Sequence, residues 1–355
     1  MGQRIVVIGA GIIGAAIACR LAEAGHSVRI IDSANPATGA SGRSFGWINA
    51  SFFANEAHFR LRAAGIAAWH RLGIDGVTWS GCLWFEEDGD ALVQMHENLK
   101  SLNYPVEHID KDIFHQLEPA IHAPPEHALR FPAEGAGETA DLTHSLVRRA
   151  MAAGAIGLFG VQIQAIETTQ GAVSCVITDA GTFSADHVIV AAGTATPDLI
   201  APLGVTLPML RRPGLLVTTR PLKPLLSHVL AAPDQELRQL PDGRLLAPTS
   251  PNHQADDAED IPENVEELAD AALGRVRALL PGHQIERDSI TVALRPVPGD
   301  GLPVVGPAGP DGLYIATMHS GVTLAAITGE LVTQELTNGG ASELLEPFRP
   351  DRLQG

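Results

Sequence analysis

Three glycines near the start of the chain have the spacing of a dinucleotide-binding turn. Gly9, Gly11 and Gly14 follow the apolar run 5–8 and precede a helical pattern over residues 15–24. In such a turn the first glycine permits the tight bend, the second lets a pyrophosphate approach the backbone, and the third lets the helix pack on its strand. The free N–H groups and the dipole of the helix N-terminus then favour the phosphate charge.

A carboxylate at the end of the next predicted strand supports this prediction. Asp32 closes the run 27–31 and lies 18 residues beyond Gly14, where an acid would bind the two ribose hydroxyls of an adenosine. An acid at this position disfavours a 2′-phosphate, so NADP is not expected. The alternative is a glycine-rich turn of an α/β fold without a ligand, which a chain with 36 glycines can produce by chance.

The composition indicates two domains and no nucleic-acid ligand, disulfide framework or metal site. The chain has 355 residues and a net charge of −17, and a phosphate backbone is bound mainly through Lys and Arg. Cys19, Cys82 and Cys175 lie far apart without a C-x-x-C spacing. The N-terminus lacks the features of a secretion signal, and no run of eighteen apolar residues occurs, so we expect a soluble, cytoplasmic protein without a membrane span.

The elements that must position these residues begin with a polar loop. Residues 37–49 are rich in glycine and serine and too polar for a core helix, so we expect them to be disordered or to bind a ligand. A long helix is predicted over 56–72. Residues 78–85 predict one aromatic strand and 90–102 a helix, whereas 118–131 is predicted to be irregular.

The middle of the chain mixes helix and strand. A helix is predicted over 141–154 and a strand meander over 161–183. The strand 187–194 is apolar on both faces and ends in small residues that include Gly193, which is typical of a buried parallel strand whose backbone meets a ligand. Residues 206–291 are β-rich, with a hairpin around 241–243 and one helix over 263–280.

The C-terminal quarter contains a second strand, turn and helix. The strand 312–317 leads through Met318, His319 and Ser320 to Gly321 and an amphipathic helix over 322–337. This order predicts a second site for an anion or a dipole at a helix N-terminus.

Together these patterns predict an α/β fold with a Rossmann-like nucleotide-binding domain of discontinuous segments and a β-rich substrate-binding domain. The nucleotide-binding domain is expected to comprise residues 1–76, 139–205 and 292–355. The substrate-binding domain is expected to comprise residues 77–138 and 206–291.

Four segments of the chain carry a resemblance to a known family. They are residues 5–32, residues 40–49, residues 188–193, and the stretch from Arg295 through Asp300-Gly301-Leu302-Pro303 to the helix at Gly321. In this order and at this spacing they resemble the FAD-dependent amine and amino-acid oxidoreductases, the group of glycine oxidase, D-amino-acid oxidase and monomeric sarcosine oxidase. The resemblance covers nearly the whole chain and implies that the nucleotide-binding segments form an FAD-binding domain.

The resemblance implies FAD-binding residues in several parts of the chain. The pyrophosphate would lie on the first turn and the adenosine ribose on the end of the second strand. A loop would run along the pyrophosphate and the ribityl chain to the isoalloxazine ring, one backbone position would meet the adenine, and the last helix would direct N–H groups at the flavin N1–C2=O edge. In chain order these residues are Gly9, Gly11, Ile12, Ile13, Gly14, Asp32, Ser33, Ala40, Ser41, Gly42, Arg43, Ser44, Gly46, Val161, Gly193, Gly321, Val322, Thr323 and Leu324.

The resemblance also implies the residues that would meet a substrate. Arg295 would pair its guanidinium bidentately with the substrate carboxylate and so hold the α-carbon over flavin N5. Arg295 could instead form a structural salt bridge. Arg211 and Arg212 are the alternative candidates for binding the substrate carboxylate. His319 would bind substrate or flavin, or cap the helix, and Trp47 would lie beside the ring, where it reshapes the substrate pocket.

The implied reaction is the oxidation of a small amino acid or N-substituted amino acid, of the D-amino acid, glycine or sarcosine type. A hydride passes from a neutral amine's carbon to flavin N5 and leaves an imine that water hydrolyses, while the protein orients the reactants. The flavin is expected to be non-covalent, because no cysteine follows Cys175 and the chain has Ser41-Gly42-Arg43 where some relatives place a histidine.

Three other interpretations remain open at this point. The chain could be the catalytic subunit of a heteromeric dehydrogenase acting on amino acids, opines or hydroxyproline, with a second dehydrogenase subunit as its partner. A homo-oligomer of this chain is the other possible assembly. It could also be an NAD-dependent dehydrogenase, or a flavin-binding protein without catalysis. The sequence does not name the substrate or the electron acceptor.

Overall fold

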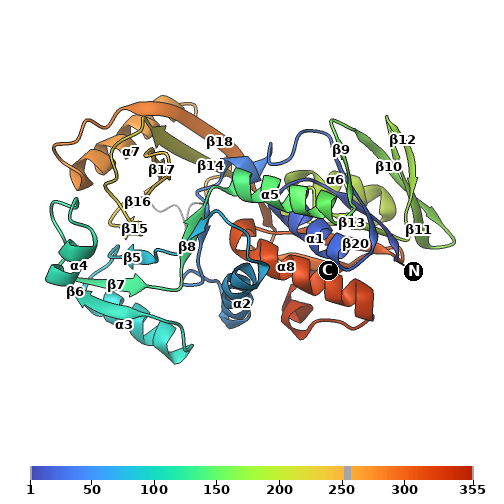
Figure 1. The fold of residues 1–355 in the computed structure, drawn as a ribbon, viewed down its shortest axis with the longest axis horizontal. Coiled ribbons are helices and arrows are strands. Elements are labelled where there is room, and N and C mark those ends of the chain that lie inside the picture. The colour runs from blue at the N-terminus through green and yellow to red at the C-terminus, as the bar shows by residue number, and fades with distance from the viewer. Residues whose placement is uncertain (1, 252–256, 354–355) are drawn as a thin grey trace.

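The computed structural model describes residues 2–251 and 257–353, which form two large and two small β-sheets. Residues 252–256, which belong to the predicted segment 206–291, lie outside the described residues together with Met1 and residues 354 and 355. In Figure 1 one large sheet and its helices occupy the right of the molecule and the other the left. The predicted α/β fold class is confirmed.

A six-stranded sheet has the N-terminal strand near its centre. Its order is β19 (Val304–Pro307), β20 (Leu313–Thr317), β13 (His187–Val190), β1 (Arg4–Ile8), β2 (Ser27–Asp32) and β9 (Ile156–Phe159). Neighbouring strands run parallel except β19, which is antiparallel to β20. Both faces of the central strands are buried, which is why β1 is apolar without alternation.

Four helices pack together beside this sheet: α1 (Ile12–Glu23), α2 (Glu56–Leu72), α5 (Thr139–Ala152) and α8 (Gly321–Asn338). α1 contacts both α5 and α8, and α2 contacts α8. The apolar residues of α1 surround the helix, so it is buried on most sides. α1 and α8 approach closely, since a Cβ at Gly329 would lie 2.7 Å from the carbonyl oxygen of Ala16.

The second large sheet has eight strands. Its order is β18 (Arg287–Pro298), β14 (Met209–Thr219), β17 (Leu245–Pro248), β16 (Gln235–Gln239), β15 (Val229–Ala232), β5 (Cys82–Trp84), β7 (His127–Phe131) and β6 (Glu107–Asp110). β15 and β5 pair in parallel and the other neighbours are antiparallel. α7 (Val265–Leu279) packs Leu273 and Val276 against this sheet, and α3 (Gly89–Ser101) and α4 (Lys111–Leu117) lie near β6 and β7.

Two three-stranded sheets and several short helices complete the described fold. One sheet is the meander β10 (Ile163–Thr169), β11 (Ala172–Thr178) and β12 (Gly181–Ser184), and the other is β3 (Trp47–Ile48), β8 (Gly135–Gly137) and β4 (Val77–Thr78). The short helices are η1 (Ala40–Arg43), η2 (Gly193–Ala195), α6 (Thr196–Ile200), η3 (Ala201–Leu203), η5 (Glu343–Phe348) and η6 (Pro350–Leu353). None of the helices in the described parts of the chain has the length and apolarity to cross a membrane.

Two local predictions are wrong. Residues 78–85 do not form one strand, because the chain turns at Gly81 with φ of +88°, and β4 and β5 join different sheets. Residues 118–131 are not irregular throughout, since their last five residues form β7. β7 pairs with β5 on one side and β6 on the other, so tertiary pairing outweighs a weak local signal.

We propose the two-domain division that the sequence predicts. The six-stranded sheet takes its strands from residues 1–76, 139–205 and 292–355. The eight-stranded sheet takes its strands from residues 77–138 and 206–291, together with β18, which crosses the boundary at residue 292 and so connects the two parts directly.

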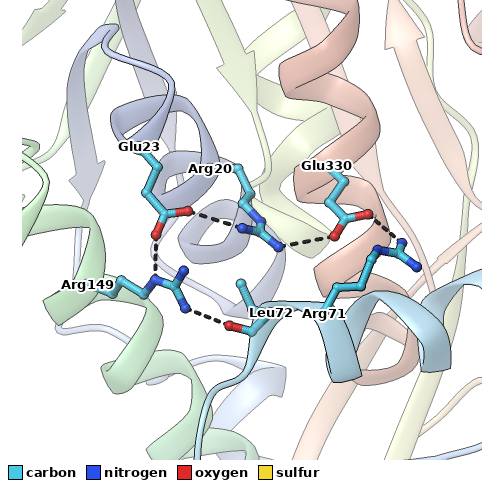
Figure 2. A network of polar contacts seen from close by, with 6 residues as sticks. All are labelled: Arg20, Glu23, Arg71, Leu72, Arg149 and Glu330. Atoms are coloured by element: carbon cyan, nitrogen blue, oxygen red, sulfur yellow. Dashed lines mark hydrogen bonds and ion pairs between the residues drawn. The ribbon is translucent and has the colours of Figure 1, made fainter.

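A network of polar contacts joins α1, α2, α5 and α8, and Figure 2 shows its six members: Arg20, Glu23, Arg71, Leu72, Arg149 and Glu330. Glu330 of α8 accepts hydrogen bonds from Arg20 of α1 at 3.1 Å and from Arg71 of α2 at 2.6 Å. On the other side of Arg20, Glu23 binds both Arg20 and Arg149 of α5. The network therefore fixes the relative positions of the four helices.

We expect Glu330→Gln to lower the free energy of unfolding by about 1 kcal/mol, because the carboxylate is shared by two guanidinium groups on neighbouring helices and its side chain is only 15% exposed. Thermal and denaturant unfolding of the ligand-free protein measure the change. The control is Glu56→Gln, which breaks the exposed pair Glu56–Arg60 and should cost less. Equal costs in both variants would contradict the role of the network.

Candidate active site

A cavity of about 590 Å³ lies between the two large sheets. Residues at the carboxyl ends of β1, β2, β13 and β20 line one side, and residues of β14 and β18 line the other. Open α/β sheets bind their ligands at the carboxyl ends of their strands. The volume is within the range of small-molecule and cofactor pockets.

The turn between β1 and α1 forms one end of the cavity. Gly9 has φ of +110°, and a Cβ there would lie 2.4 Å from the carbonyl oxygen of Ala191. A Cβ at Gly14 would lie 2.0 Å from the carbonyl oxygen of Gly9, so the helix rests directly on the turn. Gly11 caps α1 without a side chain, and the next N–H of the helix donates to Ser41 Oγ at 2.9 Å. The start of α1 therefore presents bare backbone to the cavity.

Asp32 ends β2 beside this turn. Its Oδ2 accepts a hydrogen bond from the Ala10 N–H at 2.6 Å, and its Oδ1 accepts one from the Ala34 N–H at 2.8 Å. The half-buried carboxylate lines the cavity with Ser33. Each carboxylate oxygen has a further lone pair, so the two backbone bonds fix the group without exhausting its capacity to bind hydroxyls.

The predicted polar loop is ordered and forms one wall of the cavity. It contains η1 and β3, and residues 45–50 are buried. Gly46 has φ of +75°, and a Cβ there would lie 2.2 Å from the carbonyl oxygen of Gly137. Arg238 of β16 donates to the Phe45 carbonyl oxygen and to Glu138. Burial lowers the pKa of the Arg238 guanidinium, and Glu138 opposes that change.

Trp47 is held in place by a buried carboxylate. Its Nε1 donates to Glu134 Oε2 at 2.9 Å, and its side chain is 4% exposed while still bordering the cavity. Glu134 also accepts hydrogen bonds from the Ala50 and Ser51 N–H groups and from the Tyr104 hydroxyl. Burial raises the pKa of the Glu134 carboxyl, and its donors oppose the rise. Glu134 thus connects the ring to the backbone that follows it.

Arg295 lies on β18 at the wall opposite the glycine turn. It is half-buried, and it donates to the carbonyl oxygens of Arg212 at 3.4 Å and Pro213 at 3.2 Å. Its side chain lines the cavity, whereas those of Arg211 and Arg212 do not. Arg212 pairs instead with Glu259 at 3.4 Å.

The turn before α8 forms the remaining wall. Ser320 has φ of +58° and precedes the helix, its side chain makes no capping hydrogen bond to the helix backbone, and the Nδ1 of His319 lies 3.4 Å from its Oγ. His319, Gly321 and Val322 line the cavity. Thr323 is buried behind them, and its Oγ1 accepts a hydrogen bond from the Asn49 N–H at 3.2 Å.

The structure brings most of the predicted site residues together around this cavity: Gly9, Gly11, Ile12, Ile13, Asp32, Ser33, Ala40, Ser41, Arg43, Ser44, Gly46, Trp47, Gly193, Arg295, His319, Gly321 and Val322. Five predicted residues do not line it: Gly14, Gly42, Val161, Thr323 and Leu324. Val161 lies next to the cavity, because its N–H donates to the Asp32 carbonyl oxygen, and the two residues after it form part of the wall.

Arg62 of α2 lines the cavity but is not among the predicted site residues. The buried face of α2 contains Phe59, Arg62, Ile66 and Trp69. Their spacing of three and four residues was the available signal, because it places an arginine on the apolar face of a helix, where a charged side chain is rare unless it is paired.

The residues around the cavity fit FAD. Two helix N-termini face it, the glycines at the start of α1 leave room that a Cβ would fill, and a carboxylate stands where an adenosine ribose would bind. Among the described residues no group of histidine, cysteine, aspartate or glutamate side chains has the arrangement of a metal site.

Comparisons with known proteins agree with this assignment. A family model described as FAD dependent oxidoreductase matches residues 4–335. Glycine oxidase of Geobacillus kaustophilus is 27% identical over 99% of this chain and 97% of its own length, and a crystal structure of glycine oxidase from that organism has a TM-score of 0.86 at 98% coverage of both chains. D-amino acid dehydrogenase of Rhizobium johnstonii is 23% identical over 96% of this chain and 97% of its own. L-proline dehydrogenase from P. horikoshii shares the fold, with a TM-score of 0.88 and 20% identity over 99% and 98% of the two chains.

We expect Gly11→Ala to weaken FAD binding by at least about tenfold, because a methyl group would cover backbone that a pyrophosphate must approach and would lie 3.1 Å from Ser41 Oγ. Fluorescence titration of the FAD-free protein with FAD measures the change. The control is Gly274→Ala in α7, where nothing lies within 4 Å of the added Cβ and affinity should be retained. Unchanged FAD affinity in the Gly11 variant would contradict the assignment of the pyrophosphate to this turn.

Proposed function

This chain belongs to the FAD-dependent oxidoreductase family, and we propose that within it the protein oxidises a small amino acid or N-substituted amino acid, of the D-amino acid, glycine or sarcosine type, to an imine. At the coarser level the protein is an FAD-dependent oxidoreductase that acts on the CH–NH group of amino acids. The alternative of an NAD-dependent dehydrogenase is therefore wrong. The observation that carries the proposal is the convergence of the α1 and α8 N-termini and the Arg295 guanidinium on one cavity.

We assign the cofactor to the wall formed by the six-stranded sheet. The backbone N–H groups at the start of α1 would hold the FAD pyrophosphate together with Ser41, and Asp32 would hold the adenosine ribose. The segment from Ala40 to Trp47 would follow the cofactor toward the start of α8 at Gly321. Among the described residues that line the cavity there is no cysteine, and the chain has Ser41-Gly42-Arg43 where some relatives place a histidine, so we propose that FAD is bound without a covalent link.

We assign the substrate carboxylate to Arg295. Its guanidinium reaches the cavity from the eight-stranded sheet, and hydrogen bonds to the Arg212 and Pro213 carbonyl oxygens orient its plane. Arg211 and Arg212 are the weaker candidates because neither lines the cavity. His319 borders the same space and would donate or accept one hydrogen bond from the bound amino acid.

FAD, when bound, accepts a hydride, which is two electrons and one proton, from the carbon that carries the amine. The nitrogen lone pair of the neutral amine becomes the second bond of an iminium, which loses a proton to water and is then hydrolysed to an oxo acid and ammonia or an amine. Dioxygen or another electron acceptor would then take up the two electrons. The protein's part is to orient the α-carbon through Arg295 and to exclude water with Trp47 and its buried neighbours.

The first experiment is an anaerobic titration of the purified yellow protein with glycine, sarcosine, proline, hydroxyproline and a panel of D-amino acids, followed by exposure to air. We expect at least one small amino acid to bleach the flavin absorbance. Fast recolouring in air would indicate an oxidase, and slow recolouring a dehydrogenase with another acceptor. A protein that no member of the panel bleaches, even with candidate partner subunits present, would refute the proposed substrate class.

We expect Arg295→Ala to leave FAD bound and to raise the substrate concentration for half-maximal flavin reduction by about a hundredfold, since losing a charge-assisted pair costs on the order of 3 kcal/mol. The measurement is anaerobic reduction at increasing substrate concentration. Arg211→Ala is the matched control, because it removes an exposed arginine from the paired strand β14 and should change little. If Arg211→Ala raised the half-maximal substrate concentration more than Arg295→Ala, the substrate carboxylate would be assigned to Arg211 instead.

A further inference from the structure

Arg62 is a buried cation at the edge of the cavity. It lies on α2, its side chain is 3% exposed, and it borders the cavity. α2 packs closely on the start of α8, because a Cβ at Gly65 would lie 2.5 Å from the Thr323 carbonyl oxygen and Trp69 Nε1 donates to the Val322 carbonyl oxygen at 2.8 Å. This packing brings the guanidinium to the first turn of α8.

The hydrogen-bond partners of Arg62 are neutral. Nε donates to the Asn49 carbonyl oxygen at 3.1 Å, a terminal nitrogen donates to Asn49 Oδ1, and the other donates to Ser320 Oγ at 2.7 Å. Within the described residues no carboxylate forms a salt bridge with it. The donors are therefore satisfied, while the positive charge has no direct counter-ion.

The groups around Arg62 leave this charge in place. Burial lowers its pKa to about 10, and the buried Glu134 acts against that change, so the guanidinium is protonated at neutral pH. Glu134 is not among the hydrogen-bond partners of Arg62, and its own oxygens accept hydrogen bonds from other groups. His58, one turn earlier on α2, is neutral, since burial and the charge of Arg62 lower its pKa to about 3.

The position of Arg62 connects the two segments that would meet the flavin ring. Asn49 follows Trp47 on one side, and Ser320 precedes Gly321 on the other, and all four residues line the cavity. We infer that Arg62 supplies the positive charge that stabilises the negative charge FAD gains when it accepts a hydride. The dipole of α8 adds to this charge from the same side.

This inference rests on the proposed function, because hydride transfer from an amino acid is what charges the cofactor. A residue that stabilises the reduced form more than the oxidised form raises the reduction potential in proportion to the logarithm of the ratio of the two FAD affinities. A tenfold loss of that ratio corresponds to about 30 mV for a two-electron couple. The potential is measured by dithionite titration of the FAD-loaded protein with a reference dye, so it needs no amino-acid substrate.

We expect Arg62→Gln to lower the midpoint potential by about 30 mV or more, a loss of at least about tenfold in preference for the reduced form. Arg62→Lys keeps the charge and should restore most of the potential. The matched control is Arg60→Gln, which removes an exposed charge from the same helix and should leave the potential unchanged. Thermal unfolding of the FAD-free variants measures the structural part of the effect separately.

A second variant preserves the hydrogen bonds of Arg62. Asn49→Asp keeps an acceptor at the same place and adds a carboxylate that neutralises the guanidinium, so it should also lower the potential. This variant tests the role of the Arg62 charge if Arg62→Gln does not fold. An unchanged potential in the folded neutral variants, or an equal fall in Arg60→Gln, would overturn the inference. If only the proposed function were wrong, the Arg62 variants would still lower the midpoint potential, but no amino acid would reduce the wild-type flavin.

Discussion

Close backbone packing between helices is the constraint on which the cavity depends. α1 rests on its own turn at Gly14, and α8 approaches α1 at Gly329. α2 then approaches α8 at Gly65. A side chain at any of these positions would move a helix outward, and the N-termini of α1 and α8 would no longer face one space. The polar network of Glu330, Arg20 and their neighbours joins the same helices next to the close approach at Gly329.

Buried charges position the loop that separates the two sheets. Glu134 accepts hydrogen bonds from Trp47 and from the backbone after it. Arg238, which lies in the eight-stranded sheet, donates a hydrogen bond to the Phe45 carbonyl oxygen. Burying charged groups is costly unless they are well bonded, so such groups contribute more to a unique geometry than to stability. The loop is rich in glycine and serine, and it becomes a defined wall because these side chains from other segments bind it.

The sequence predicted features that depend on short-range order. The turn at Gly9 and Gly11, the carboxylate of Asp32 and the glycine-opened helix at Gly321 are local patterns, and the structure brings them to one cavity. Arg295 could be predicted because a family pattern surrounds it. Arg62 was indicated only by its place on the buried face of α2, and its role could not be predicted because Ser320 is far away in sequence. Glu134 could not be predicted, because its partners Trp47 and Tyr104 are far away in sequence and no local motif marks it. The break at Gly81 was missed for a related reason, since β4 and β5 are separated by their partners in different sheets.

The strand pairing of β1 has a consequence for the way the chain acquires its fold. β1 pairs with β2 nearby, but its other neighbour is β13, and the helix that completes the cavity begins only at Gly321. During synthesis one edge of β1 stays unpaired until about half of the chain, as far as β13, has been made. Contacts of such high sequence separation slow folding and expose unpaired strand edges meanwhile. Because α8 begins only at Gly321, the cavity in which we propose that FAD binds can be complete only after most of the chain has been synthesised.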